Sequence, residues 1–293
     1  MKELKLMIEK LESFAIQEEA IRAMILNGSR VDEKVEGDIF QDYDVVCLTR
    51  DVAFYRENRQ WIKRFGEIMI MQTPDGMGTN STGEKTEKFT FLLQFADGQR
   101  LDITFFPVDS IHNIQHESLS KVILDKDGLL GELPPPSNKD YLTLPPSEKE
   151  FNDCCNEFWW VSTYIAKGLW RKELPYAKAM FDGPVRDMLV LMIRWHIGQK
   201  HNFSVDSGKC GKYFEKYLEA EVWNQFVKTY PDGDYETIWQ ALFEMGSLFR
   251  KLACELAVQF GFVYNEEEDT KVTAHLEHVR RLPSNAKIMY PDK

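Results

Sequence analysis

The chain has 293 residues and a formal charge of −11 at pH 7, from 36 Lys and Arg against 47 Asp and Glu. Its apolar fraction of 43% is enough to bury a core and excludes an intrinsically disordered chain. The acidic balance argues against a nucleic-acid partner, because binding to the phosphate backbone requires a basic face.

The sequence shows no sign of a membrane segment or a signal peptide. No apolar run approaches the roughly 20 residues that a membrane helix needs, and the N-terminal segment has an amphipathic pattern without a continuous apolar core. The five cysteines have no CxxC spacing, which argues against a zinc site or a disulfide framework. We therefore expect a cytoplasmic protein without a membrane partner.

The first part of the chain is predicted to mix helices and strands. An apolar run at residues 22–26 ends at the turn signal Asn27-Gly28-Ser29, and Asp97-Gly98 between two alternating runs is typical of a hairpin. The patterns predict a helix at 1–24, a strand at 43–48, a helix at 51–66, a polar loop at 72–88, and hairpin strands at 89–95 and 100–107.

The second part of the chain is predicted to be helical. Five of the twelve prolines lie between Pro134 and Pro146, which indicates a boundary between domains at 1–135 and 147–293. After this stretch the patterns predict helices at 147–171, 184–200, 208–220, 222–229 and 234–260, with residues 266–269 as an acidic loop. The segregation predicts an α+β protein, with a mixed β-sheet flanked by helices followed by an all-helical bundle domain.

Three aspartates carry the clearest chemical signal. Asp42 and Asp44 lie at the start of a predicted strand and face the same side, because side chains alternate along a strand. Asp102 lies on a later strand whose apolar neighbours face the other way. Clustered carboxylates repel one another unless a divalent cation lies between them, and Mg²⁺ prefers carboxylate and phosphate oxygens. Gly28 and Ser29, which twelve intervening residues separate from Asp42, permit close backbone approach and can hold a phosphate.

At these residues the sequence resembles the nucleotidyltransferase superfamily typified by polymerase β, whose signature is Gly-Ser followed by Asp-x-Asp and a third carboxylate. More particular segments resemble the aminoglycoside 6-adenylyltransferases, also called streptomycin adenylyltransferases. These segments are FQDYDV (40–45), ILDKDG (123–128), FNDCCNEFWWVSTYIAKGL (151–169), RDMLVLMIRWHIG (186–198) and GKCGKYF (208–214).

The resemblance implies an enzyme that transfers AMP from ATP to a hydroxyl of an aminoglycoside, with streptomycin as the expected acceptor, and releases pyrophosphate. It implies a nucleotidyltransferase domain at 1–135 and a helical substrate- and nucleotide-binding domain at 147–293. Asp42 and Asp44 would hold two Mg²⁺ ions, and Asp102 would act as general base or complete the metal site. The implied nucleotide-binding residues are Gly28, Ser29, Arg30, Arg194, Lys209 and Lys212.

One stripe of the predicted helix at 147–171 combines acids with aromatic rings. Asp153, Glu157, Trp160 and Tyr164 follow one another at spacings of four, three and four. Carboxylates and rings suit a cationic aminoglycoside, and the family resemblance favours this interpretation over a simple packing face. The stripe at 151, 155, 158, 162, 165 and 169 is the expected core face.

Two other readings remain open from the sequence. The same chemistry would serve another acceptor, such as a different antibiotic, a protein or an RNA end. A non-catalytic nucleotide-binding or antitoxin-like member is the other alternative, although such a protein is expected to lose one of the three carboxylates. His196, His275 and His278 are expected to have structural roles, and the oligomeric state is not specified.

Overall fold

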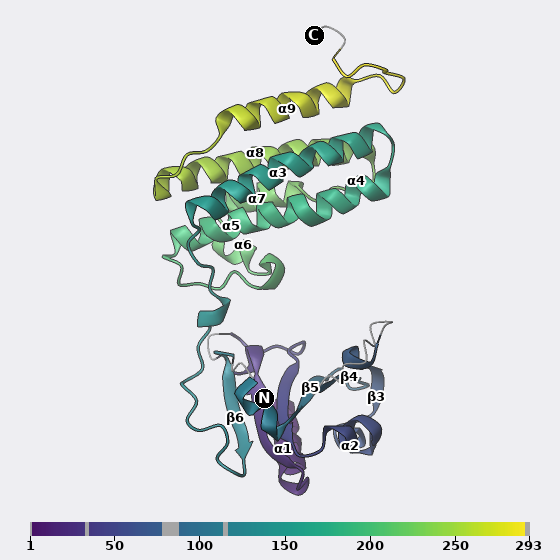
Figure 1. Cartoon of the computed structure of the whole chain (residues 1–293), viewed down its shortest axis with the longest axis vertical. Coiled ribbons are helices and arrows are strands. Elements are labelled where there is room, and N and C mark those ends of the chain that lie inside the picture. The colour runs from purple at the N-terminus through teal and green to yellow at the C-terminus, as the bar shows by residue number, and fades with distance from the viewer. Residues whose placement is uncertain (1, 33–34, 78–87, 114–116, 291–293) are drawn as a thin grey trace. The chain divides into compact units, whose positions relative to one another are not determined.

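The computed structural model describes residues 2–32, 35–77, 88–113 and 117–290 (Figure 1). Contacts within the chain divide it into two compact units, Met1–Asp140 and Tyr141–Lys293. The division lies inside the proline-rich stretch 134–146. Each unit encloses its own hydrophobic core. None of the helices in these ranges combines the length and apolar character required to cross a bilayer.

The N-terminal unit is built on a six-stranded mixed sheet with the strand order β3-β4-β5-β2-β1-β6. The pair β2–β5 is parallel, and the other neighbouring pairs are antiparallel. The strands are β1 (Ile21–Asn27), β2 (Tyr43–Thr49), β3 (Ile68–Gln72), β4 (Phe89–Phe95), β5 (Arg100–Pro107) and β6 (Ser120–Asp125).

An aromatic core closes one face of this sheet. α1 (Lys2–Gln17) and α2 (Val52–Glu57) contribute Phe14 and Tyr55 to it. The Tyr55 ring stacks on Phe105 of β5 at a centroid distance of 4.5 Å, and Trp61 packs edge-on against the same ring. Because β5 alternates, burying Phe105 on this face directs Asp102 to the opposite one.

The C-terminal unit is the predicted all-helical bundle. Its long helix α3 begins at a capping box, in which the Ser147 hydroxyl accepts from the Glu150 amide and the Glu150 carboxylate accepts from the Ser147 amide. The apolar stripe predicted for this helix is wholly buried, and Phe158 stacks on Phe249 of α8 at 3.8 Å. The helices are α3 (Glu148–Trp170), α4 (Leu174–Met180), α5 (Arg186–Lys200), α6 (Phe214–Tyr217), α7 (Ala220–Lys228), α8 (Tyr235–Phe260) and α9 (Glu266–Arg281).

Several predicted elements are wrong in extent or type. The first helix ends at Gln17, and the helix predicted at 51–66 is interrupted after Glu57 and continues as a 3₁₀ turn. No single helix covers 208–220, because Gly208, Cys210 and Gly211 all have positive φ. Residues 266–269 form the first turn of α9 rather than a loop. β3, β6 and α4 were not predicted, and residues 78–87 of the predicted polar loop lie outside the described residues.

Candidate active site

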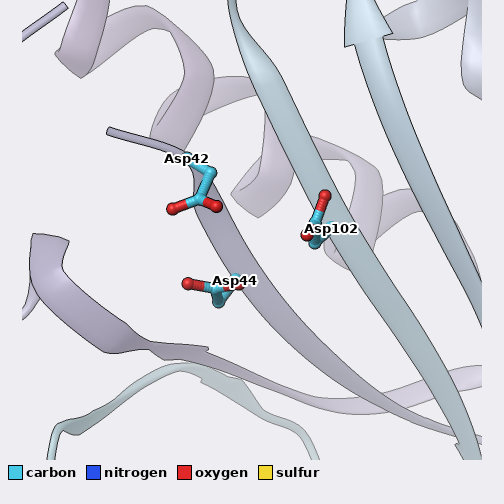
Figure 2. Close-up of side chains that lie close together, drawn as sticks. All are labelled: Asp42, Asp44 and Asp102. Carbon is cyan, nitrogen blue, oxygen red and sulfur yellow. The ribbon is translucent and has the colours of Figure 1, made fainter. Parts of the chain in front are cut away.

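The three aspartates converge on one face of the sheet. The parallel register of β2 and β5 places Asp44 directly opposite Asp102, and Asp42 lies two residues before Asp44. One carboxylate oxygen from each lies within 4.8 Å of the other two. Figure 2 shows the three side chains on the same side of the two strands. The structure therefore brings together the carboxylates that the sequence places on one face.

Burial and like charge act together on Asp44. Burial, and after it the neighbouring charges of Asp42, Asp102 and Glu117, together raise the pKa of Asp44 to about 7. Arg100 opposes the shift. Below about pH 7 the cluster therefore holds a proton on Asp44, and this proton must leave before all three carboxylates can ligate a cation.

Arg100 is the counter-charge of the cluster, and sequence reasoning missed it. Its guanidinium donates to both oxygens of Asp102, from Nε at 2.9 Å and from Nη2 at 2.6 Å. Its Nε also lies 3.8 Å from Asp42 Oδ2. The signal was present, because residues 100 and 102 share one side of a strand. Glu117, which also acts on Asp44, carried no comparable signal in the sequence.

Gly28 allows the loop after β1 to approach the carboxylates. Its φ is +78°, and a Cβ atom at this position would lie 2.6 Å from Asp44 Oδ2. The Gly28 amide donates to Leu119 O, which continues the ladder with β6. Position 28 thus requires a glycine, because a larger residue would collide with the Asp44 carboxylate. Within the described ranges the Ser29 hydroxyl has no hydrogen-bond partner, so it remains the group that can meet a phosphate.

Arg30 fixes the segment that leads into β2. Its Nε donates to Asp42 O at 2.8 Å, Nη2 donates to Gln41 O, and the guanidinium stacks over the Tyr43 ring at 3.8 Å. The remaining nitrogen, Nη1, is buried and has no partner among the described residues. Arg30 therefore orients Asp42 through the backbone and keeps one donor available.

The cluster fits a hard divalent cation. It offers three convergent carboxylate groups, which are the ligands that Mg²⁺ prefers, and its ionised form carries three negative charges against one from Arg100. An ion pair between Arg100 and Asp102 with a purely structural role would not explain why the backbone at Gly28 comes so close to the Asp44 carboxylate. The residues that would hold the cation are Asp42, Asp44 and Asp102.

In the helical unit, the basic residues that the family resemblance implies for nucleotide binding lie close together. Arg194 on α5 donates from Nη2 to Gly208 O at 3.1 Å, and its Nε is buried without a partner in the described part of the chain. Lys209 and Lys212 lie on the same turn and are exposed. Three cationic side chains thus lie around one turn. Gly208 permits this turn because its φ is +77°.

The four residues predicted to bind the acceptor share one face of α3 but not one cavity. Asp153 lines a cavity of about 570 Å³ together with Trp159, Glu266 and Glu268. Tyr164 lines a different cavity towards the C-terminal end of α3. Glu157 and Trp160 are exposed between them, and the Trp160 indole donates to the Tyr164 hydroxyl at 2.7 Å.

The histidines have structural partners. His196 is 3% exposed and lies 3.4 Å from Glu219 and 3.5 Å from Glu255. His275 shares a hydrogen bond of 2.6 Å with the Tyr290 hydroxyl, and the His278 ring stacks on Tyr290 at 4.6 Å. These contacts agree with the structural roles expected for them.

With this geometry, the comparison with known proteins decides the family. The family model described as "Streptomycin adenylyltransferase" matches residues 1–279. The chain belongs to this family. It is accordingly a nucleotidyltransferase enzyme, as the resemblance of its motifs implies.

Curated relatives agree over most of the chain. The chain is 35% identical to "Aminoglycoside 6-adenylyltransferase" of Bacillus subtilis (strain 168), over 93% of this chain and 96% of the relative. It is 34% identical to the protein of that name from Campylobacter jejuni, over 86% and 87%. A crystal structure of an aminoglycoside 6-adenyltransferase from Bacillus subtilis is 32% identical, covers 94% of this chain and 98% of its own, and gives a TM-score of 0.47.

The raised pKa of Asp44 predicts a pH-dependent stability in the absence of metal. Between the unfolded pKa of 3.8 and the folded pKa of about 7 only the folded state binds this proton, so the contribution of Asp44 to stability is fully present below pH 3.8 and is lost as the pH rises to about 7. Asp44→Asn should remove this loss. Relative to the parent, we expect it to gain roughly 2–4 kcal/mol between pH 5 and pH 8.5.

Urea unfolding in EDTA at several pH values measures this gain. Asp97→Asn, an exposed aspartate in the hairpin turn, is the matched control and should give no such trend. Adding Mn²⁺ at pH 8.5 should stabilise the parent and not Asp44→Asn. If the free energy of unfolding of Asp44→Asn and that of the parent change in parallel with pH, the raised pKa of Asp44 is contradicted.

Gly28→Ala tests the close approach to Asp44. The added methyl group collides with the carboxylate, so we expect Mn²⁺ binding to weaken at least about tenfold, which corresponds to about 1.4 kcal/mol. Gly98→Ala is the control, because Gly98 also has a positive φ of +90° but nothing lies within 4 Å of its added methyl group. Calorimetric titration with Mn²⁺ should separate the two variants, and equal affinities would show that backbone strain alone matters.

Proposed function

We propose that the chain transfers AMP from ATP to a hydroxyl of an aminoglycoside and releases pyrophosphate, with streptomycin as the expected acceptor. The observation that carries the proposal is the convergence of Asp42, Asp44 and Asp102 within 4.8 Å in a member of this family. The names of the curated relatives support an aminoglycoside acceptor.

The carboxylates divide the chemical work. Two Mg²⁺ ions, when bound, would neutralise the triphosphate and align the α-phosphorus. Asp42 and Asp44 would hold these ions. Asp102 would accept the proton of the attacking hydroxyl or complete the metal site. The new bond forms between the acceptor oxygen and the α-phosphorus, and the bond to the leaving pyrophosphate breaks.

Each unit contains residues that we propose for nucleotide binding. In the N-terminal unit these are the Ser29 hydroxyl and the buried Nη1 of Arg30, on a loop whose approach depends on Gly28. In the helical unit they are Arg194, Lys209 and Lys212 around one turn. We accordingly assign 1–135 as the nucleotidyltransferase domain and 147–293 as the domain that binds substrate and nucleotide.

The acceptor would use the acidic and aromatic face of α3. Asp153 and Glu157 offer charge, and Trp160 and Tyr164 offer rings to a polycationic sugar. The use of ATP and the lack of disulfides among the cysteines fit a cytoplasmic setting, and the negative net charge fits a protein without a nucleic-acid partner.

The reaction is tested directly with ATP, Mg²⁺ and a panel of aminoglycosides. We expect pyrophosphate release and a mass gain of one AMP on the drug, with streptomycin as substrate. Asp42→Asn and Asp44→Asn should abolish transfer, because the metal site loses a charged ligand. Asp97→Asn should match the parent. Near-full activity of either site variant at ordinary Mg²⁺ would remove the metal site from the mechanism.

Asp102→Asn separates the two roles of Asp102. If Asp102 is mainly a base, the rate falls strongly while Mg²⁺-ATP binding changes little. If Asp102 is mainly a ligand, Mg²⁺-ATP binding falls in step with the rate. Rates and nucleotide affinities measured on the same preparation decide between them.

The acceptor face is tested by neutralising both acids. Asp153→Asn with Glu157→Gln should lower kcat/KM for streptomycin by one to several orders of magnitude, because a hydrogen bond to a charged group contributes about 1.5–3 kcal/mol. ATP binding should change far less. The control is Asp187→Asn with Glu215→Gln, which removes the same charge from exposed positions elsewhere in the helical unit.

Steady-state kinetics with saturating ATP, at low and high salt, measure this effect. The parent should lose affinity for the drug as salt rises, since exposed charge pairs are screened, and the double variant should lose less. A kcat/KM within threefold of the parent would refute the acceptor face and leave the nucleotide chemistry intact.

A further inference from the structure

A cavity of about 480 Å³ lies within the helical unit, and none of the three clustered aspartates lines it. It is bounded by the C-terminal part of α3, by α9 and by the segment 282–290 that follows α9. A volume of this size suits a small organic molecule, because ligand pockets commonly measure about 300–1,000 Å³.

The segment after α9 is tied to the helices, so the cavity is already formed. The Trp170 indole donates to Leu282 O at 3.1 Å. His275 shares a hydrogen bond with the Tyr290 hydroxyl, and His278 contacts Met289 O. An occupant would therefore meet an ordered wall rather than a free tail.

The walls of the cavity are largely apolar, and part of that surface is exposed to water. Val279 and the ring of Trp170 contribute from the helices. On the tail, Ile288 is 66% exposed and Met289 is 46% exposed, and both line the cavity. An apolar group in the cavity would remove these side chains from water, which is favourable in proportion to the area covered.

The charged residues of the cavity are all cationic. Lys167, Arg171 and Lys287 line it, and no Asp or Glu is among its described lining residues, although the chain carries a net charge of −11. The Lys167 ammonium lies 4.7 Å from the centre of the Tyr164 ring. Arg171 and Lys287 have no ion pair within the described ranges.

The position of α3 explains only part of this charge. Lys167 and Arg171 lie at the C-terminal end of the helix, where the macrodipole favours cations. Lys287 lies on the irregular tail and has no such partner, and like charges around one cavity repel each other. An anion in the cavity would relieve this repulsion.

We propose that this cavity binds an amphipathic organic anion: an alkyl or aryl group that packs on Trp170, Val279 and Ile288, with a phosphate, sulfonate or carboxylate paired with Arg171 and Lys287. Such a ligand has the opposite charge to an aminoglycoside, so this is a site separate from the proposed acceptor face. Tyr164 is the one residue that borders both.

Decyl phosphate, kept below its micelle concentration, is the probe for isothermal titration calorimetry on the full chain. We expect one equivalent to bind. Inorganic phosphate lacks the apolar group and decyl maltoside lacks the charge, so both should bind far more weakly. Arg171→Glu with Lys287→Glu should raise the Kd of decyl phosphate about tenfold, since two attractions become repulsions. Ile288→Ser should weaken binding without a change in charge.

Lys63→Glu with Lys228→Glu is the matched control, because both lysines are exposed and Lys228 also lies in the last turn of a helix. It should bind decyl phosphate as the parent does. Equal loss in both double variants would show a general effect of net charge and overturn the site. Displacement of decyl phosphate by ATP would assign the cavity to the nucleotide instead. Binding to phosphatidylglycerol vesicles without binding of decyl phosphate would overturn the proposal in favour of a membrane surface.

Discussion

The candidate active site depends on the parallel pairing of β2 with β5 in one register. This register sets Asp44 opposite Asp102, and a slip of one residue would turn Asp102 towards the aromatic core. The stack of Tyr55 on Phe105 fixes the alternation of β5 from the other side of the sheet. The apolar face thus holds the carboxylates in place from the other side of the sheet.

The second constraint is electrostatic. Three carboxylates in one place cost free energy, and the protein limits this cost in two ways: Arg100 pairs with Asp102, and the pKa of Asp44 is raised to about 7. Both arrangements respond to a divalent cation, which would displace the proton on Asp44 and compete with Arg100 for the oxygens of Asp102. The repulsion built into the sheet would therefore favour the binding of a cation, at the expense of stability without metal.

The aspartate cluster could be predicted from the sequence because side chains alternate between the two faces of a strand, and this alternation can be read from neighbouring residues alone. The alternation around Asp42, Asp44 and Asp102 assigns each to a face without knowledge of the fold. β3 escaped prediction for the opposite reason. Ile68, Met69 and Ile70 are apolar without alternation, and all three are exposed on an edge strand.

Backbone conformation accounts for the other errors. The helical pattern over 208–220 fails because Gly208 and Gly211 adopt positive φ, which side-chain periodicity does not report. The predicted loop at 266–269 is wrong as well, because these acids form the first turn of α9, where the macrodipole favours negative charge. Arg194 lies fifteen residues before Lys209 in the sequence, so only the fold brings it to the turn at Gly208.

The long helix α3 separates surfaces of opposite charge. At its N-terminal end Asp153 borders a cavity with Glu266 and Glu268, and at its C-terminal end Lys167 and Arg171 border the cavity closed by the tail. This order of charges stabilises the helix, because the acids lie near the positive end of the helix macrodipole and the bases lie near its negative end. The same order divides possible ligands by charge: cations are attracted to one end and anions to the other. A polycationic acceptor on the exposed face of α3 would therefore be drawn towards Asp153 and away from Lys167, which gives it one preferred direction along the helix.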